Sequence, residues 1–251
     1  MDVAFCSHVD DEYSVGLAAL MRSLRQSNPH IAIPYIVCYS EVLSEASRRR
    51  IELEYPNIKY RTIASDLYQK CCFTKHRDWR MSPAFRYELF RVVDYEQLIY
   101  LDADMIIVGN IDELLAYRGD VAACSLPPGE GMEIKHLGGF NSGVLSLGKR
   151  VRTPEIWRKL MHVAEASPWS GNQTVLNLVL KDMYHELPSE FNVGSTRMTP
   201  EKLVSARIVH YVGKRKPWQS EEPFGVNQIR LAGQDMCDTL LRLWKKYAPE
   251  E

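Results

Sequence analysis

The feature of this sequence that most constrains its fold is an alternation, over the first hundred residues, of short apolar runs with helical patterns. Residues 3–6 and 98–101 have the length and composition of buried strands, residues 31–39 are rich in strand-forming residues, and residues 58–63 also predict a strand. Pro34 is an irregularity within the second run. Strands that alternate with helices predict a mostly parallel sheet with helices on both faces, which is the α/β class.

Three helical patterns separate these runs. The first has an apolar face whose members recur at spacings of three and four residues: Leu17, Leu20, Met21 and Leu24. The second starts at Ser44 and ends near residues 55–56. The third starts at Ser82 and Pro83, which suit the N-cap and the first helical position. Its predicted apolar face consists of Phe85, Leu89, Val92 and Val93.

Beyond residue 110 the alternation is looser. Apolar runs predict strands at residues 121–126, 143–147 and 208–212. Helical patterns cover residues 153–166, 173–181 and 235–247. The chain has no internal repeat and no linker rich in Pro, Gly or Ser, so one continuous domain over residues 1–251 is expected.

Charge and cysteine usage exclude several classes of protein. The 251 residues include 31 Lys and Arg against 32 Asp and Glu, which excludes a polybasic nucleic-acid binder. Cys6, Cys38 and Cys124 lie in apolar runs and are expected to be buried, and the six cysteines form no C-x-x-C pair. No apolar run reaches the roughly 18 residues that span a bilayer, and the first residues lack a signal-peptide pattern. We expect a reduced, cytoplasmic protein with at most peripheral membrane contact through the basic segment 240–247.

The most informative local feature is a pair of acids directly after a predicted strand. Asp102 and Asp104 flank Ala103, with apolar runs on both sides. In open α/β sheets ligands bind at the carboxyl ends of the strands, and oxygen ligands suit Mg²⁺ or Mn²⁺. Such a pair can also consist of turn formers or caps, but two charges between apolar runs are costly to bury without a partner. The pair therefore indicates a divalent cation and a phosphorylated or nucleotide substrate.

Five segments carry a resemblance to a known family. They are D-D-E-Y-S-V-G-L-A-A-L-M-R-S-L at 10–24, Y-L-D-A-D at 100–104, F-N-S-G-V at 140–144, N-Q-T-V-L-N at 172–177 and H-Y-V-G-K-R-K-P-W at 210–218. In these segments the chain resembles the family 8 glycosyltransferases, the group that contains glycogenin and bacterial galactosyltransferases of lipooligosaccharide synthesis. The resemblance implies a GT-A fold with a Rossmann-like, mostly parallel central sheet, a UDP-sugar donor, Mn²⁺ (or Mg²⁺) and retention of anomeric configuration. It also implies a nucleotide-binding half at about 1–115 and an acceptor and metal half at about 116–251.

The resemblance assigns the metal and the diphosphate to two of these segments. It places the metal ligands at Asp102, Asp104 and His210. A lone histidine at a strand end is more often structural, but the G-K-R-K-P-W that follows favours a functional role. Gly213 would let the backbone approach the diphosphate, and Lys216 would place its charge on a phosphate oxygen. Lys214 and Arg215 are expected to be solvated.

By the same resemblance, the remaining donor contacts come from the N-terminal turn and from the middle of the chain. The residues implied are Ser7, Val9, Asp10 and Tyr13 for base and ribose, Arg86 and Ala103 for diphosphate and sugar, and Asn141 and Ser142 for sugar hydroxyls. Asp10 can accept from the uracil N–H and Tyr13 can stack on the ring. Alternatively, Asp10 only favours a helix N-terminus and Arg86 is a surface residue. The loop 127–139 is expected to order over the donor and contribute to acceptor selection.

The pair Asn172 and Gln173 departs from the family, which usually has Asp-Gln here. The resemblance places both residues at the catalytic position, beside the donor sugar. An amide is a poor nucleophile, so Gln173 fits a front-face pathway in which it stabilises the transition state. Asn172 loses a charge and keeps one carbonyl acceptor, which predicts either a changed sugar preference or reduced activity.

Three functions remain as alternatives. The first is a retaining transferase that moves a hexosyl group from a UDP-sugar to a hydroxyl of a glycan or another acceptor. The second is a catalytically impaired nucleotide-sugar-binding module of the same fold, which Asn172 favours. The third is a haloacid-dehalogenase-type phosphatase, but that family has its D-x-D near the N-terminus and Thr or Val where this chain has Ile106.

Overall fold

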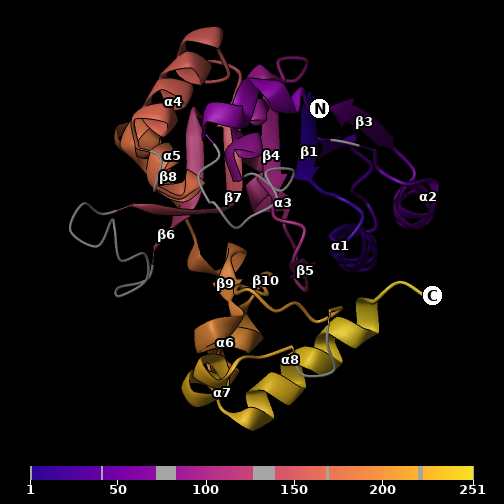
Figure 1. Cartoon of the computed structure of the whole chain (residues 1–251). Coiled ribbons are helices and arrows are strands. Elements are labelled where there is room, and N and C mark those ends of the chain that lie inside the picture. The colour runs from indigo at the N-terminus through magenta and orange to yellow at the C-terminus, as the bar shows by residue number, and fades with distance from the viewer. Residues whose placement is uncertain are drawn as a thin grey trace.

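A computed structural model describes residues 2–40, 42–71, 83–126, 139–167, 170–219 and 223–250. Its centre is a seven-stranded sheet with the order β3-β2-β1-β4-β7-β6-β8 (Figure 1). The strands are β1 (Val3–His8), β2 (Tyr35–Tyr39), β3 (Ile58–Thr62), β4 (Gln97–Leu101), β6 (Val121–Ser125), β7 (Phe140–Gly148) and β8 (Tyr184–Leu187). All neighbouring pairs are parallel except the two that β7 makes with β4 and β6. The prediction of an α/β chain with a mostly parallel sheet is confirmed.

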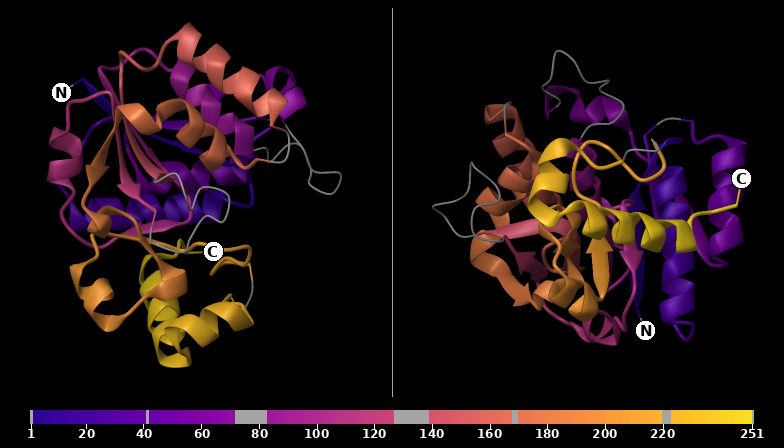
Figure 2. Two further views of the ribbon diagram at one scale, coloured as in Figure 1. Left: turned by 90° about the vertical axis from the view of Figure 1, so that its left-hand side faces the viewer. Right: turned by 90° about the horizontal axis from the view of Figure 1, so that it is seen from below.

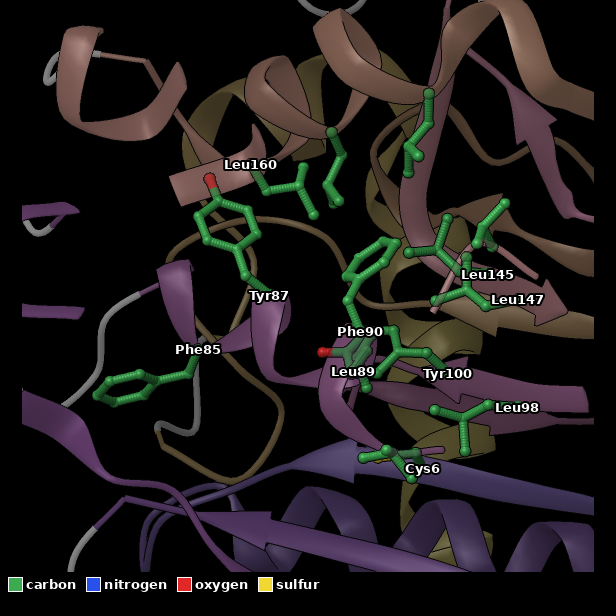
Figure 3. Packing of buried hydrophobic residues seen from close by; sticks show 14 of the residues in the cluster. Cys6, Phe85, Tyr87, Leu89, Phe90, Leu98, Tyr100, Leu145, Leu147 and Leu160 are labelled. Carbon is green, nitrogen blue, oxygen red and sulfur yellow. The ribbon is translucent and has the colours of Figure 1, made fainter. Parts of the chain in front are cut away.

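Helices cover both faces of this sheet (Figure 2). On one side lie α1 (Ser14–Ser27) and α2 (Glu45–Glu54), and on the other lie η3 (Pro83–Arg91), α4 (Pro154–Ala166) and α5 (Asn172–Leu180). Two smaller helical segments, η1 (Ser65–Cys71) and α3 (Asp112–Ala116), complete this part of the chain. Tyr87 and Phe90 of η3 point into a core that also contains Leu145 of β7 and Leu160 of α4 (Figure 3). Because η3 is anchored by this core, it holds its side chains at a fixed distance from the carboxyl ends of β1 and β4.

A second, three-stranded sheet lies beyond the carboxyl end of β4. It has the order β5-β10-β9, formed by β5 (Met105–Ile107), β10 (Ile208–His210) and β9 (Val193–Gly194). The remaining short elements are η4 (Lys181–Met183), η5 (Ser189–Phe191), η6 (Ser195–Arg197), α6 (Pro200–Ser205) and α7 (Val226–Ala232). The last helix, α8 (Gln234–Tyr247), buries Leu240 and Trp244 against this sheet, in one cluster with Ile106 and Val209. The C-terminal part of the chain therefore packs on the three-stranded sheet, below β5 and β10 in the view of Figure 1.

Most predicted elements are present, and two details of the prediction are wrong. Strand β2 begins at Tyr35, because Pro34 cannot donate a backbone hydrogen bond to a neighbouring strand. The pattern at 83–93 forms a 3₁₀ helix that ends at Arg91, so Val93 lies beyond it and is 45% exposed instead of joining its apolar face. Ser82 lies outside the described residues. The cysteines at positions 6, 38 and 124 are buried as predicted. Within the described ranges, no helix combines the length and hydrophobicity needed to cross a membrane.

Candidate active site

The two acids that follow β4 and the imidazole that ends β10 meet at one point. Asp102 lies directly after the last residue of β4, and Asp104 directly before β5. The Nε2 atom of His210 is 3.2 Å from Oδ1 of Asp104 and 3.8 Å from Oδ2 of Asp102. One ligand atom from each of the three side chains lies within 4.8 Å of the other two. The predicted set of three metal ligands is therefore brought together in space.

Backbone pairing explains how His210, more than a hundred residues away in sequence, reaches the acids. Strand β10 runs antiparallel to β5, with His210 opposite Met105, and the N–H of Tyr211 donates to the carbonyl of Asp104 at 2.8 Å. Gly143 on β7 leaves room for the ring, since a Cβ there would lie 2.7 Å from Cε1 of His210. The imidazole is 6% exposed and so has little freedom to move.

Lys216 adds a buried positive charge to this cluster. Its Nζ donates to Oδ2 of Asp104 at 2.5 Å and to the carbonyl of Tyr211 at 2.9 Å, and the residue is 3% exposed. Burial alone would raise the pKa of Asp104, but His210 and Lys216 outweigh it and hold that pKa well below its usual value. Asp104 is therefore a carboxylate throughout the neutral range. Gly213 has φ of 116°, in the left-handed region, which lets the chain turn between His210 and Lys216.

Arg86 of η3 adds a second positive charge, which pairs with Asp102, and its side chain is 14% exposed. Its guanidinium donates to Oδ1 of Asp102 and to Ser142, whose hydroxyl lies at 2.5 Å and whose carbonyl lies at 3.2 Å. It also stacks 4.8 Å from the ring centre of Tyr100, whose hydroxyl donates to the same Asp102 oxygen at 2.7 Å. Burial opposes the charge of Arg86, but Asp102 outweighs it and raises the pKa, so this side chain is permanently charged. The alternative of a plain surface arginine is wrong.

The donor set fits a hard or borderline divalent cation. Two carboxylates and one imidazole are ligands that Mn²⁺ and Mg²⁺ accept, and the described residues around them contribute no thiolate that would favour zinc. The two cations that pair with the acids, Arg86 and Lys216, are suited to the oxygens of a phosphate group. The arrangement can therefore bind a divalent cation together with a phosphorylated ligand.

The N-terminal turn lies beside the acidic pair. A Cβ on Gly16 of α1 would come within 2.5 Å of the carbonyl of Ala103, so the start of α1 packs directly on the segment that joins the acids. The ring of Tyr13 meets Trp218 edge to face at 5.5 Å, and burial raises the pKa of Tyr13 to about 12. Asp10 accepts from the N–H of Tyr13 at 2.8 Å, and burial raises its pKa. Contacts of Asp10 and Tyr13 with the base and ribose of a donor stay a prediction.

Ser7 and Val9 are less accessible than the other predicted contacts. The hydroxyl of Ser7 contacts the hydroxyl of Tyr35 at 2.7 Å and donates to the carbonyl of Leu101 at 2.6 Å, and Ser7 is fully buried. Val9 is 1% exposed, and its N–H donates to the carbonyl of Cys38. Their side chains are thus engaged within the protein, and a donor contact of either residue stays a prediction.

The predicted sugar-binding residues converge from β7 and α5. Oε1 of Gln173 accepts from the N–H of Ser142 at 3.0 Å, which fixes the side chain of Gln173 against the strand that also contacts Arg86. Asn172 is the first residue of α5, one residue before Gln173. Asn141 accepts from the N–H of Gly143 at 2.8 Å. Residues 127–138, which make up almost all of the loop expected to cover the donor, lie outside the described residues.

Sequence reasoning missed three residues of this site. Tyr100 hydrogen-bonds Asp102, and Oδ1 of Asn192 lies 2.9 Å from Nδ1 of His210. Trp218 joins the predicted Tyr13 to the core through Trp244, at ring distances of 5.5 and 5.0 Å. Tyr100 and Trp218 lie inside quoted motifs and could have been chosen as neighbours of the functional residues. Asn192 lies in no motif, and no local signal marks it.

Proteins of similar sequence include several transferases. The lipopolysaccharide 1,2-glucosyltransferase of Escherichia coli (strain K12) is 26% identical over 241 residues, which cover 84% of this chain and 71% of that protein. Glycogenin-1 of Oryctolagus cuniculus is 23% identical over 256 residues, which cover 94% of this chain and 72% of that protein. For the glycosyltransferase GlyE of Streptococcus pneumoniae serotype 4 the identity is 27% over 164 residues, and the match covers 58% of this chain but only 38% of that protein.

The fold of the chain resembles that of a solved galactosyltransferase, and its sequence matches a family of transferases. The galactosyltransferase LgtC, solved in complex with donor and acceptor sugar analogs, superimposes with a TM-score of 0.73 at 18% identity, covering 97% of this chain and 99% of LgtC. That likeness confirms the predicted GT-A fold. The pattern of the family described as "Glycosyl transferase family 8" matches residues 3–222, and the chain therefore belongs to this family.

Proposed function

We propose that this family 8 glycosyltransferase moves a hexosyl group from a UDP-sugar to an acceptor hydroxyl with the help of Mn²⁺ and with retention of anomeric configuration. The observation that carries the proposal is the meeting of Asp102, Asp104 and His210 at the carboxyl end of β4, where Arg86 pairs with the first acid and Lys216 with the second. A glycan is the acceptor class that the relatives' names favour.

The two cations bind and orient the donor diphosphate. When a nucleotide sugar reacts, the bond between the sugar and the diphosphate breaks, and negative charge develops on the leaving phosphate. Arg86 and Lys216 are fixed in place before the reaction, so they can stabilise that charge without reorganisation. A divalent cation held by the two aspartates and His210 would supply Lewis-acid stabilisation of the same charge. No general acid for the leaving oxygen is then required.

Gln173 lies at the position that faces the reacting sugar in this proposal. Its amide is anchored through Oε1 on the N–H of Ser142, and α5 holds its backbone. An amide is a poor nucleophile, so we assign Gln173 to positioning and stabilising the sugar as positive charge develops on it, and not to a covalent intermediate. The acceptor oxygen then bonds to the sugar on the face that the diphosphate leaves, and its hydroxyl proton passes to the departing phosphate oxygen, so the configuration is retained.

Asn172 supports a second candidate, a nucleotide-sugar-binding module with impaired catalysis. The family usually has an aspartate here, and the amide of Asn172 at the start of α5 lacks that negative charge. Both candidates bind UDP and a divalent cation, and they differ only in turnover. We further propose that residues 1–251 act as one domain and that the protein works in a reducing compartment, which the free, buried thiols of Cys6, Cys38 and Cys124 support.

The experiment is a panel of UDP-sugars, with and without Mn²⁺, in which release of UDP is measured. We expect metal-dependent release for at least one sugar, and we expect Asp104→Asn to abolish it because the substitution removes one charged ligand. Asp112→Asn, on the exposed start of α3, is the matched control and should keep wild-type activity. UDP release by Asp104→Asn at the wild-type rate in the presence of EDTA would refute the proposal. Binding of UDP and Mn²⁺ without turnover of any donor would favour the impaired module.

A further inference from the structure

A continuous row of hydrogen bonds leads from the backbone of β7 to the imidazole of His210. The N–H of Gly143 donates to Oδ1 of Asn141 at 2.8 Å. The same oxygen accepts from Nδ2 of Asn192, also at 2.8 Å. Oδ1 of Asn192 then lies 2.9 Å from Nδ1 of His210. This row touches the proposed metal site on the side of the ring that faces away from the two aspartates.

The direction of every hydrogen bond in the row is fixed by its first member. A backbone N–H can only donate, so the atom of Asn141 that faces Gly143 is its carbonyl oxygen. That oxygen can only accept, so Asn192 must present its NH₂ group to it and its carbonyl oxygen to His210. Nδ1 of His210 must therefore carry a proton. The backbone N–H of Gly143 therefore sets the tautomer of His210 through the two asparagines. The orientations of both amide groups follow from it and are not free choices.

The geometry of the ring makes this tautomer consequential. With a proton fixed on Nδ1, the only ring nitrogen that the imidazole can offer to a metal ion is Nε2, which is the atom that faces Asp104 at 3.2 Å and Asp102 at 3.8 Å. The absence of a side chain at Gly143 lets the ring lie against β7. Strand β9, which begins directly after Asn192, pairs in parallel with β10, with Gly194 opposite His210, and so holds the segment that carries Asn192 beside β10. Both the tautomer and the ring position are thus imposed before any ligand arrives.

We infer that Asn192, acting through His210 and held by Asn141, is a positioning residue that presets the Nε2 lone pair of His210 for a divalent cation. The inference rests on the proposed function, since it assumes that the three-residue cluster binds a metal ion. It also gives Asn141 a second role besides the predicted contact with sugar hydroxyls. Its Oδ1 accepts hydrogen bonds from Gly143 and Asn192, and so Asn141 fixes the orientation of Asn192. Partners that orient a metal-bound histidine typically change metal affinity by about 10- to 100-fold when they are removed.

The test measures the dissociation constant of Mn²⁺ for the nucleotide-free protein, by electron paramagnetic resonance of the unbound ion, together with the thermal unfolding midpoint. Asn192→Leu removes the acceptor for Nδ1, and we expect it to weaken Mn²⁺ binding about 10-fold or more. Asn141→Leu should have a similar effect because it leaves Asn192 free to rotate. Asn141→Asp keeps an oxygen that accepts from both donors. We therefore expect the dissociation constant of Mn²⁺ to rise by at most about threefold over that of wild type.

The outcomes separate the inference from the function on which it rests. If the wild-type protein binds no Mn²⁺, the proposed function fails. If wild type binds Mn²⁺ and Asn192→Leu binds it equally well, the inference is overturned and the proposed function stands. If Asn141→Asp loses as much affinity as Asn141→Leu, the deduced hydrogen-bond direction is wrong. Should Asn192→Leu fail to fold, the comparison of the two Asn141 variants decides alone.

Discussion

The imidazole of His8 should make the stability of this protein depend on pH in a way that can be calculated. His8 ends β1, its ring meets Phe85 edge to face at 5.1 Å, and its buried Nε2 has no hydrogen-bond partner among the described residues. Burial, with a smaller contribution from the nearby charge of Arg86, lowers the pKa of His8 from 6.5 to about 4. His8 is therefore neutral in the folded protein at every pH at which the enzyme would work.

The magnitude follows from the difference between the folded and the unfolded pKa. Below pH 6.5 the unfolded chain takes up a proton on this histidine, whereas the folded protein does so only near pH 4. The unfolded state thus binds more protons in this window, and the free energy of unfolding falls as the pH falls. Each pH unit inside the window corresponds to about 1.4 kcal/mol, so a change from about pH 7.5 to about pH 5 should remove about 2 kcal/mol.

The assay is urea unfolding at these two pH values, for wild type and for His8→Gln. Other groups titrate in both proteins alike, so the wild type should lose about 2 kcal/mol more than His8→Gln does between about pH 7.5 and about pH 5. His162→Gln, which replaces an exposed histidine on α4, is the control and should follow wild type. Equal losses in wild type and His8→Gln would show that His8 is not held neutral by burial, and the reasoning would be refuted.

Three further predictions concern the site. Lys216→Met should weaken UDP binding about 10-fold or more and lower the free energy of unfolding by about 3 kcal/mol, because it removes the lysine partner of the buried carboxylate of Asp104. The exposed Lys214→Met should change neither quantity. Titration calorimetry measures the first effect and urea unfolding the second. Gly213→Ala forces a side chain into the left-handed region and should cost about 1–2 kcal/mol in unfolding experiments, whereas Gly225→Ala, at φ of −75° with open space around it, should stay within about 0.5 kcal/mol. Asn172→Asp restores the family's usual charge and should change the ranking of donor sugars in the UDP-release panel; an unchanged ranking would contradict our account of this position.

The central sheet could be predicted from sequence because its signals are local. Strands β1 and β2 are short apolar runs that are each followed by a helix, and both patterns can be recognised without knowing what they pack against. The direction of β7 could not be predicted, because a strand's own residues do not state which neighbour it will pair with. The three-stranded sheet was missed for a related reason, since β9 comprises only Val193 and Gly194 and has no periodicity to detect.

The site shows the same division between local and distant signals. Asp102 and Asp104 stand out because two charges interrupt an apolar stretch, which is a local cost that requires a partner. His210 could be placed with them only through the family resemblance, because the antiparallel pairing of β5 and β10 is invisible in either segment alone. Asn192 carries no signal at all. An asparagine near a short 3₁₀ turn is ordinary, and only the pairing of the following strand β9 with β10 brings this segment beside the imidazole.

The balance of charges gives a reason why the acids and cations of this site come in pairs. Asp102 and Asp104 have side chains only 18% and 10% exposed, and two such carboxylates near each other would repel strongly if nothing neutralised them. Arg86 pairs with the first and Lys216 with the second, so the fold can hold both acids ionised before any ligand binds. We assign the same two cations to the donor diphosphate. Each of them therefore contributes both to the folding stability of the protein and to its affinity for UDP. These contributions can be separated, because the loss of folding stability in a Lys216 variant needs no nucleotide, whereas the loss of affinity appears only when UDP is added.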